Sequence, residues 1–170
     1  RGLPPLTARV GISTGTVLHG NIGSRKRMEW GMVGDQVNLA SRLEAMGKRY
    51  GASILVSGAL VARLPPGRFL TRPVDRVVVY GKSDVTDVHE LVPSRAEASA
   101  DQVRMCEDVA LLVAAYRGRR FHEAQRRALA HAQTFPCDRR LAEIYRQRSE
   151  ASAVAPPGPE WEAVHIMKQK

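Results

Sequence analysis

The stretch Val33-Gly34-Asp35-Gln36-Val37-Asn38-Leu39-Ala40-Ser41-Arg42-Leu43-Glu44 has the pattern of an amphipathic helix that begins after Gly34. Gly34 and Asp35 favour a helix start, and the carboxylate of Asp35 suits the positive end of the helix dipole. Gly47 is a natural C-terminal glycine. We therefore expect a helix over about residues 35–47.

The expected helix has two distinct faces. Leu39, Leu43 and Met46 recur at helical spacing and predict an apolar stripe. Asn38 and Arg42 lie four residues apart and share a different face. An amide and a guanidinium placed together in this way can hold a polyanionic ligand, although such a face on an anonymous helix is most often simply solvated.

Strands and helices are expected on both sides of this helix. The first two strands are expected to form a hairpin around Gly15-Thr16. The expected strands cover about residues 8–14, 17–22, 29–33, 52–57, 69–74, 76–80 and 86–91, and the other expected helices cover 59–64, 103–116, 121–134 and 140–150. Strands interrupted by helices, with hairpins present, predict an α+β fold with a mixed sheet.

The composition is that of an ordinary globular protein with a basic surface. The 170 residues are 44% hydrophobic and carry a formal net charge of +9. The arginines are dispersed and lack an aromatic platform or zinc-finger spacing, so we predict no nucleic-acid partner, with polyanion binding as the alternative. Cys106 and Cys137 have no metal-ligand spacing and fit a reducing, cytoplasmic compartment. No apolar run approaches the roughly 20 residues that span a bilayer.

Four motifs carry a resemblance to a known family. They are Arg9-Val10-Gly11-Ile12-Ser13-Thr14-Gly15, Gly20-Asn21-Ile22-Gly23-Ser24, the stretch from Val33 to Glu44, and the pair Ile54-Leu55-Val56-Ser57 with Val79-Tyr80-Gly81-Lys82. In this order and spacing they resemble the second half of a class III adenylyl/guanylyl cyclase catalytic domain, over about residues 6–92. The resemblance implies a partial ferredoxin-like domain with a mixed sheet.

The resemblance also implies a division of the chain. Residues 1–93 would form the C-terminal half of the catalytic domain and residues 94–100 a linker. Residues 101–150 resemble one tetratricopeptide unit, as in the C-terminal extensions of bacterial adenylate cyclases. Residues 151–170 form a Pro-rich segment and a hydrophobic tail that contains Trp161. Because the chain begins with Arg1, we expect a longer protein, in which any membrane anchor lies upstream.

The resemblance implies a reaction used in signal transduction. The ribose 3′-hydroxyl of ATP attacks the α-phosphate, which gives cyclic AMP and releases pyrophosphate. In the family, two aspartates from the first half of the domain hold two Mg²⁺ (or Mn²⁺) ions. Those aspartates would precede Arg1, so we expect this segment to be incompetent alone. The family works as a head-to-tail homodimer with shared sites.

Motif matching assigns roles to individual side chains. Asn38 matches the ribose-orienting asparagine of the family, and Arg42 matches its transition-state arginine. Lys26 or Arg27, in the loop before the helix, would reach the β- and γ-phosphates. Lys82 would add a phosphate contact in place of the lysine that the family commonly has at the position of Tyr80.

Gly31 is the main departure from the family pattern. It occupies the base-selecting position seven residues before Asn38, and glycine has no side chain that reads a base edge. Trp30 or a backbone group would have to substitute. We expect a weak preference for ATP over GTP. The alternatives are a guanylyl cyclase, or a degenerate cyclase-homology module that acts in dimerisation or regulation.

Overall fold

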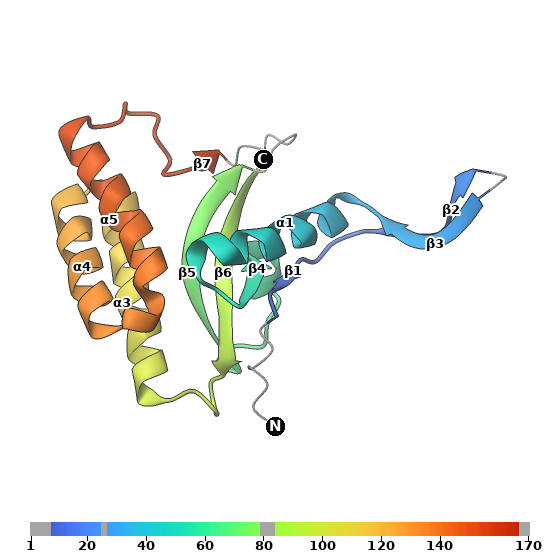
Figure 1. The fold of residues 1–170 in the computed structure, drawn as a ribbon, viewed down its shortest axis with the longest axis horizontal. Coiled ribbons are helices and arrows are strands. Elements are labelled where there is room, and N and C mark those ends of the chain that lie inside the picture. The colour runs from blue at the N-terminus through green and yellow to red at the C-terminus, as the bar shows by residue number, and fades with distance from the viewer. Residues whose placement is uncertain (1–7, 25–26, 79–83, 167–170) are drawn as a thin grey trace, which may run out of the picture.

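A computed structural model describes residues 8–24, 27–78 and 84–166. Its main sheet has five strands in the order β1-β4-β6-β5-β7 (Figure 1). Their bounds are Val10–Ile12 for β1, Ile54–Ser57 for β4, Val85–Ser94 for β6, Phe69–Val78 for β5 and His165–Ile166 for β7. The outer pairs β1·β4 and β5·β7 are parallel, and the inner pairs are antiparallel. The predicted α+β fold with a mixed sheet is confirmed.

The remaining strands, β2 (Leu18–Ser24) and β3 (Arg27–Val33), form a separate antiparallel ribbon. Figure 1 shows this ribbon projecting away from the rest of the molecule, beyond the start of α1. We call it the arm. The predicted hairpin between the first two strands is wrong, because β1 pairs in parallel with β4 and β2 pairs with β3. The segment at Gly15-Thr16 instead carries the chain from the sheet into the arm.

The first long helix, α1 (Asp35–Tyr50), ends later than predicted. Gly47 stays inside the helix and is buried, while Gly51 takes the left-handed conformation with φ of 72° and closes the C-terminus. This conformation is the one for which glycine is favoured at a helix end. The extra turn buries Tyr50 and so extends the apolar stripe.

Five further helical segments complete the fold. They are α2 (Gly58–Val61), α3 (Ala100–Arg117), α4 (Phe121–Thr134), the 3-10 turn η1 (Pro136–Asp138) and α5 (Arg139–Val154). α3 begins earlier than predicted because Ser99 and Gln102 form a capping box, in which each side chain bonds the other residue's backbone N–H. Residues 121–134 were predicted as a helix with the bounds of α4.

α1 lies directly on β1. A side chain at Gly11 would put its Cβ 2.0 Å from the carbonyl oxygen of Ala40 and 2.5 Å from the backbone nitrogen of Glu44. These distances are far below van der Waals contact, so only glycine lets the strand and the helix backbone approach this closely. Gly11 therefore allows α1 to pack at this short distance from the sheet.

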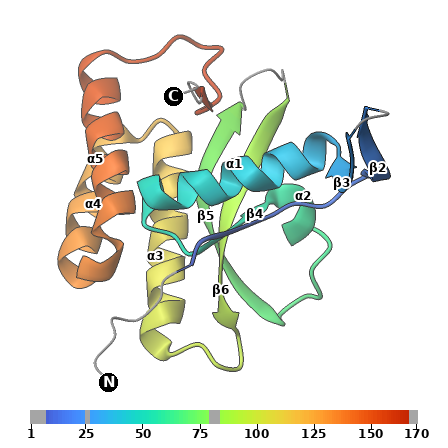
Figure 2. The ribbon, with the colours of Figure 1, turned by 45° about the vertical axis from the view of Figure 1, so that its right-hand side comes forward.

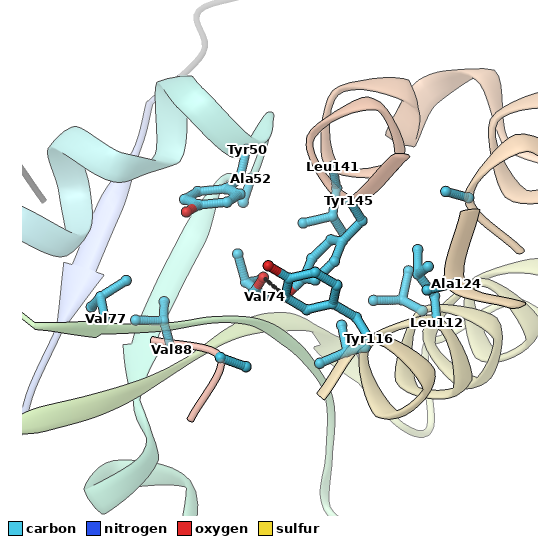
Figure 3. Packing of buried hydrophobic residues seen from close by; sticks show 14 of the residues in the cluster. Tyr50, Ala52, Val74, Val77, Val88, Leu112, Tyr116, Ala124, Leu141 and Tyr145 are labelled. Atoms are coloured by element: carbon cyan, nitrogen blue, oxygen red, sulfur yellow. Dashed lines mark hydrogen bonds between the residues drawn. The ribbon is translucent and has the colours of Figure 1, made fainter. Parts of the chain in front are cut away.

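One hydrophobic core joins the sheet, α1 and the C-terminal helices (Figures 2 and 3). Its buried members include Leu43, Tyr50, Leu55, Val74, Val77, Val88, Val109, Leu112, Leu141 and Tyr145. α3 packs along β5, and α5 contacts both α3 and α1. The C-terminal helices thus pack on the main sheet and on α1.

The tail after α5 returns to the sheet. Trp161 makes edge-to-face contacts with Tyr116 and Phe121, at centroid distances of 5.2 and 5.5 Å. The strand β7 then pairs with the end of β5. Because aromatic contacts of this kind add to the gain from burial, the tail ties the helices and the sheet together a second time.

A buried ionic network crosses from the sheet to the helices. Arg72 of β5 pairs with Glu90 of β6 and with Asp138 of η1, and its Nη2 lies 2.8 Å from Asp138 Oδ1. His131 of α4 lies 2.7 Å from Asp108 of α3 and 2.9 Å from Asp138. Both ring nitrogens face carboxylates, so the doubly protonated imidazolium fits this site.

The network predicts a pH-dependent contribution to stability. Burial alone lowers the pKa of His131, but its hydrogen bonds to Asp138 and Asp108 outweigh this, and the pKa is raised above 6.5. A raised folded-state pKa stabilises the fold fully below the unfolded value, and this stabilisation is lost as the pH rises through the folded value. We expect His131→Gln to lower the free energy of unfolding by about 2 kcal/mol near pH 6 and by less near pH 9.

Denaturant unfolding at several pH values measures this difference. His122→Gln is the matched control, because His122 lies exposed on the same helix. A difference between wild type and His131→Gln that stays constant with pH would contradict the charged network.

Candidate functional site

The polar face of α1 is the candidate site. Leu43 and Met46 are buried and Leu39 is partly buried, so the predicted apolar stripe is confirmed. Asn38 is exposed and Arg42 is half-buried, one turn apart on the same rigid helix. The structure therefore brings together the two side chains that the sequence singled out.

Side-chain contacts with β1 and its flanking residues fix the position of α1. The hydroxyl of Ser13, just after β1, donates to Oε1 of Gln36 at 2.5 Å. Arg9 and Glu44 form an ion pair at 3.2 Å, further along the helix. Gly11 lies between these two contacts and permits the close approach described above. The N-terminal half of α1, which carries Asn38, is thus held against β1.

The predicted phosphate-binding residues are placed differently. Arg27 begins β3, at the end of that strand remote from α1, and is exposed in an ion pair of 2.8 Å with Glu29. Within one chain the structure does not bring Arg27 next to Asn38 and Arg42 (Figure 1). Lys26 and Lys82 lie outside the described residues.

Gly31 lies in the middle of β3 opposite Gly20. A Cβ built at Gly31 would meet the Cδ1 atom of Ile22 at 3.3 Å, the end of a flexible side chain. A Cβ atom therefore fits at this position if the end of the Ile22 side chain moves by a few tenths of an ångström. Packing does not require glycine at position 31, so the predicted base-selecting position accepts other residues.

The arm carries an apolar face that the sequence reasoning missed. Met28, Trp30 and Met32 alternate along β3 and are 56%, 72% and 63% exposed. Residues two apart on a strand share a face, so the three side chains lie in one row. The period-two pattern from Met28 to Met32 was the signal that could have shown this. A two-stranded ribbon with such a face is marginally stable without a partner surface.

The described residues lack both a cluster of metal-binding side chains and a membrane-spanning helix. Residues 8–24, 27–78 and 84–166 contain no group of three or more His, Cys, Asp or Glu side chains that could hold a metal ion. Over the same ranges, no helix is both long enough and apolar enough to cross a membrane.

Comparison with known proteins places this site in a family. The family model described as the adenylate and guanylate cyclase catalytic domain matches residues 3–91. Adenylate cyclase 1 of Rhizobium meliloti is 43% identical over 91 residues, and the adenylate cyclase of Anabaena cylindrica is 38% identical over 92 residues. These alignments cover 54% and 53% of the chain but only 14% and 18% of the relatives.

A solved structure is also similar over part of the chain. The adenylyl cyclase CyaB of P. aeruginosa is 32% identical with a TM-score of 0.43, and the match covers 58% of this chain and 49% of that one. The family match ends before α3, so the tetratricopeptide resemblance of the helices stays a prediction. Because the family model covers more than half of the chain, including α1 with Asn38 and Arg42, the chain belongs to the adenylate and guanylate cyclase catalytic domain family.

Proposed function

We propose that this chain is the C-terminal half of a catalytic domain that converts ATP into cyclic AMP and pyrophosphate. The observation that carries the proposal is the pairing of Asn38 and Arg42 on the accessible face of α1, inside the segment that the family model matches. Asn38 would orient the ribose, and Arg42 would stabilise the negative charge that accumulates on the α-phosphate oxygens in the transition state.

The chemistry favours arginine for this role. The guanidinium is permanently charged and donates two parallel hydrogen bonds, which suits the oxygens of a pentavalent phosphorane better than a lysine ammonium does. Arg42 is half-buried on a helix held to β1 at both its first turn and its third. A donor that is already oriented needs little reorganisation when the transition state forms.

We propose that the metal ions come to this site through ligands from outside the chain. A guanidinium has no acceptor atom and cannot ligate a metal ion, and a single amide oxygen does not make a metal site, so Asn38 and Arg42 fit contacts to the nucleotide. Two Mg²⁺ (or Mn²⁺) ions, when bound, would neutralise phosphate charge and activate the 3′-hydroxyl. Asp35 is placed in the first turn of α1, where a carboxylate suits the helix dipole.

We also propose a head-to-tail homodimer in which the arm is part of the interface. The row of Met28, Trp30 and Met32 supplies an apolar surface that a second copy would cover. Contact with a partner protomer would also place Arg27, which lies away from Asn38 and Arg42 within one chain, beside a nucleotide bound in the interface.

A second candidate function is a degenerate cyclase-homology module that acts in dimerisation or regulation. The observation that favours it is Gly31, which presents no side chain to a purine. Nucleotide binding by the full-length protein, meaning this chain with any residues encoded beyond either end, separates the two functions. Binding of an ATP analogue without turnover would favour the module, and rapid formation of cyclic nucleotide would exclude it.

Arg42→Ala tests the catalytic role. In the full-length protein we expect kcat to fall by about two to three orders of magnitude with KM nearly unchanged, because the guanidinium acts mainly when the phosphorane forms. Lys48→Ala is the control, since it removes the same charge from an exposed position of the same helix and should leave kcat unchanged. A rise in KM at constant kcat would show that Arg42 only binds substrate.

Gly31→Thr tests nucleobase selection. Glycine leaves a gap beside the base, and a gap discriminates poorly because neither purine leaves a buried polar group unpaired. We expect the wild type to prefer ATP weakly, and Gly31→Thr or Gly31→Asp to raise the ratio of kcat/KM for ATP over GTP by about tenfold. A clear wild-type preference for GTP, or no response to either substitution, would defeat this assignment.

Trp30→Ser tests the arm as an interface. Removing the largest exposed apolar side chain of the row should weaken the dimer by about tenfold or more, because buried aromatic side chains often dominate interface energies. Sedimentation velocity of the full-length protein over a concentration series measures the change. Leu129→Ser, at an exposed apolar position of α4, is the control. Equal dimerisation of the Trp30 and Leu129 variants and the wild type would remove the arm from the interface.

A further inference from the structure

A buried carboxylate joins the candidate catalytic helix to the C-terminal helices. Asp75 lies in β5 at a bulge between Pro73 and Asp75, and is 1% exposed. The bulge shifts the alternation of the strand, so that Val74 and Asp75 are both buried. A β-bulge commonly re-aims a side chain in this way. Here the bulge directs the carboxylate of Asp75 into the core.

Groups from α1, α5 and β5 itself donate hydrogen bonds to this carboxylate. The hydroxyl of Tyr50, the last residue of α1, donates to Oδ2. Arg148 of α5 donates from Nη1 to Oδ1 at 3.0 Å and from Nη2 to Oδ2 at 2.9 Å. The backbone N–H of Arg76 donates to Oδ1 at 2.8 Å. Asp75 thus joins α1 and α5 through one carboxylate.

The charges in this cluster are balanced and fixed. The single negative charge of Asp75 faces the single positive charge of Arg148. Burial and the neighbouring carboxylate raise the pKa of Tyr50 well above its usual value, so its hydroxyl stays protonated and donates. A bidentate arginine–carboxylate pair fixes orientation as well as distance. The cluster therefore holds Tyr50 at one position relative to α5.

α5 contacts the end of α1 a second time. Nη1 of Arg140 donates to the carbonyl oxygen of Lys48 at 2.9 Å, one of the carbonyls that the helix itself leaves unpaired. A Cβ at Gly51 would lie 3.3 Å from Cδ of Arg140, so the two elements are in close contact there. α5 therefore bonds the C-terminus of α1 directly through Arg140, and indirectly through Arg148 and the shared carboxylate of Asp75.

We propose that α5 sets the position of the catalytic helix through Asp75, so that Tyr50, Asp75 and Arg148 are positioning residues for Asn38 and Arg42. The inference rests on the proposed function of α1. Arg42 lies eight residues before Tyr50, about 12 Å along a helix that rises 1.5 Å per residue. An α-helix is stiff over this length, so a displacement at Tyr50 moves the guanidinium of Arg42 as well.

Catalysis is sensitive to such a displacement. A misplacement of about 1 Å caused by a residue far from the chemistry can lower the rate by about two orders of magnitude. The C-terminal helices would thereby tune turnover without contacting the nucleotide. If Asp75 has only a structural role, breaking its hydrogen bonds lowers the stability of the fold without a specific loss of kcat. Measuring both quantities therefore separates a structural role from a positioning role.

The first experiment compares two arginines of α5. Arg148→Lys keeps the charge but loses the bidentate geometry. Arg146→Lys makes the same change at an arginine whose ion pairs, among the described residues, are with Glu143 and Glu150 of its own helix. In the full-length protein we expect Arg148→Lys to lower kcat about tenfold with KM within about twofold of wild type. Arg146→Lys should leave both constants unchanged.

The second experiment compares two buried tyrosines. Tyr50→Phe removes the hydroxyl that joins α1 to Asp75, and Tyr145→Phe removes a hydroxyl of α5 that donates to the carbonyl of Val74 at 3.0 Å (Figure 3). Both variants retain the packed ring, so both should fold. We expect Tyr50→Phe to lower kcat by about the same factor as Arg148→Lys, and Tyr145→Phe to lower it less.

Hydrogen exchange gives a readout that does not need activity. We expect Tyr50→Phe and Arg148→Lys to speed amide exchange in α1 at residues 38–46 by about tenfold while amides of β5 and β6 change less, and the two controls to leave α1 protected. Full kcat in Tyr50→Phe and Arg148→Lys, or uniform exchange changes across sheet and helices, would overturn the inference. If the wild type is inactive but Tyr50→Phe and Arg148→Lys speed amide exchange only in α1, the proposed function is refuted and the positioning of α1 by Asp75 is supported.

Discussion

The fold depends on how a buried negative charge is compensated. Asp75 is almost fully enclosed, and an unpaired carboxylate there would cost several kcal/mol. Its partners come from α1 and from α5, two elements about 100 residues apart in the chain. The sheet, the candidate catalytic helix and the C-terminal helices therefore have to assemble together, because none of them satisfies Asp75 alone.

This constraint changes how the C-terminal helices are understood. The sequence separates them from the catalytic half by composition, and the family match ends before α3. In the structure the same helices share the core with α1 and β5, and the Arg72–Asp138–His131 network fixes them to the sheet a second time. They pack as an integral part of the fold, and both the expected pH dependence from His131 and the proposed positioning of Arg42 follow from that packing.

Local patterns predicted the parts of the fold that depend on local physics. The helical period from Leu39 to Met46, the polar pair Asn38 and Arg42, and the helix at 121–134 all follow from spacing along the chain. The pairing of β1 with β4 depends on residues more than 40 positions apart, so the sequence suggested a local hairpin instead. The Asp75 side chain is buried because of a β-bulge, and sequence composition does not reveal a bulge. The sequence did predict a break between two strands at this residue. The roles of Asn38, Arg42, Gly31 and Arg27 stay predictions.

A crystal structure of the full-length protein with a non-hydrolysable ATP analogue and Mg²⁺ tests the central claim most directly. We expect the Arg42 guanidinium to lie within hydrogen-bond distance of the nucleotide phosphates and Asn38 to contact the ribose. We also expect the metal ligands at the same nucleotide to come from the partner protomer. A nucleotide bound away from the polar face of α1 would contradict the proposed roles of Asn38 and Arg42, and a nucleotide whose contacts all come from a single protomer would contradict the shared site.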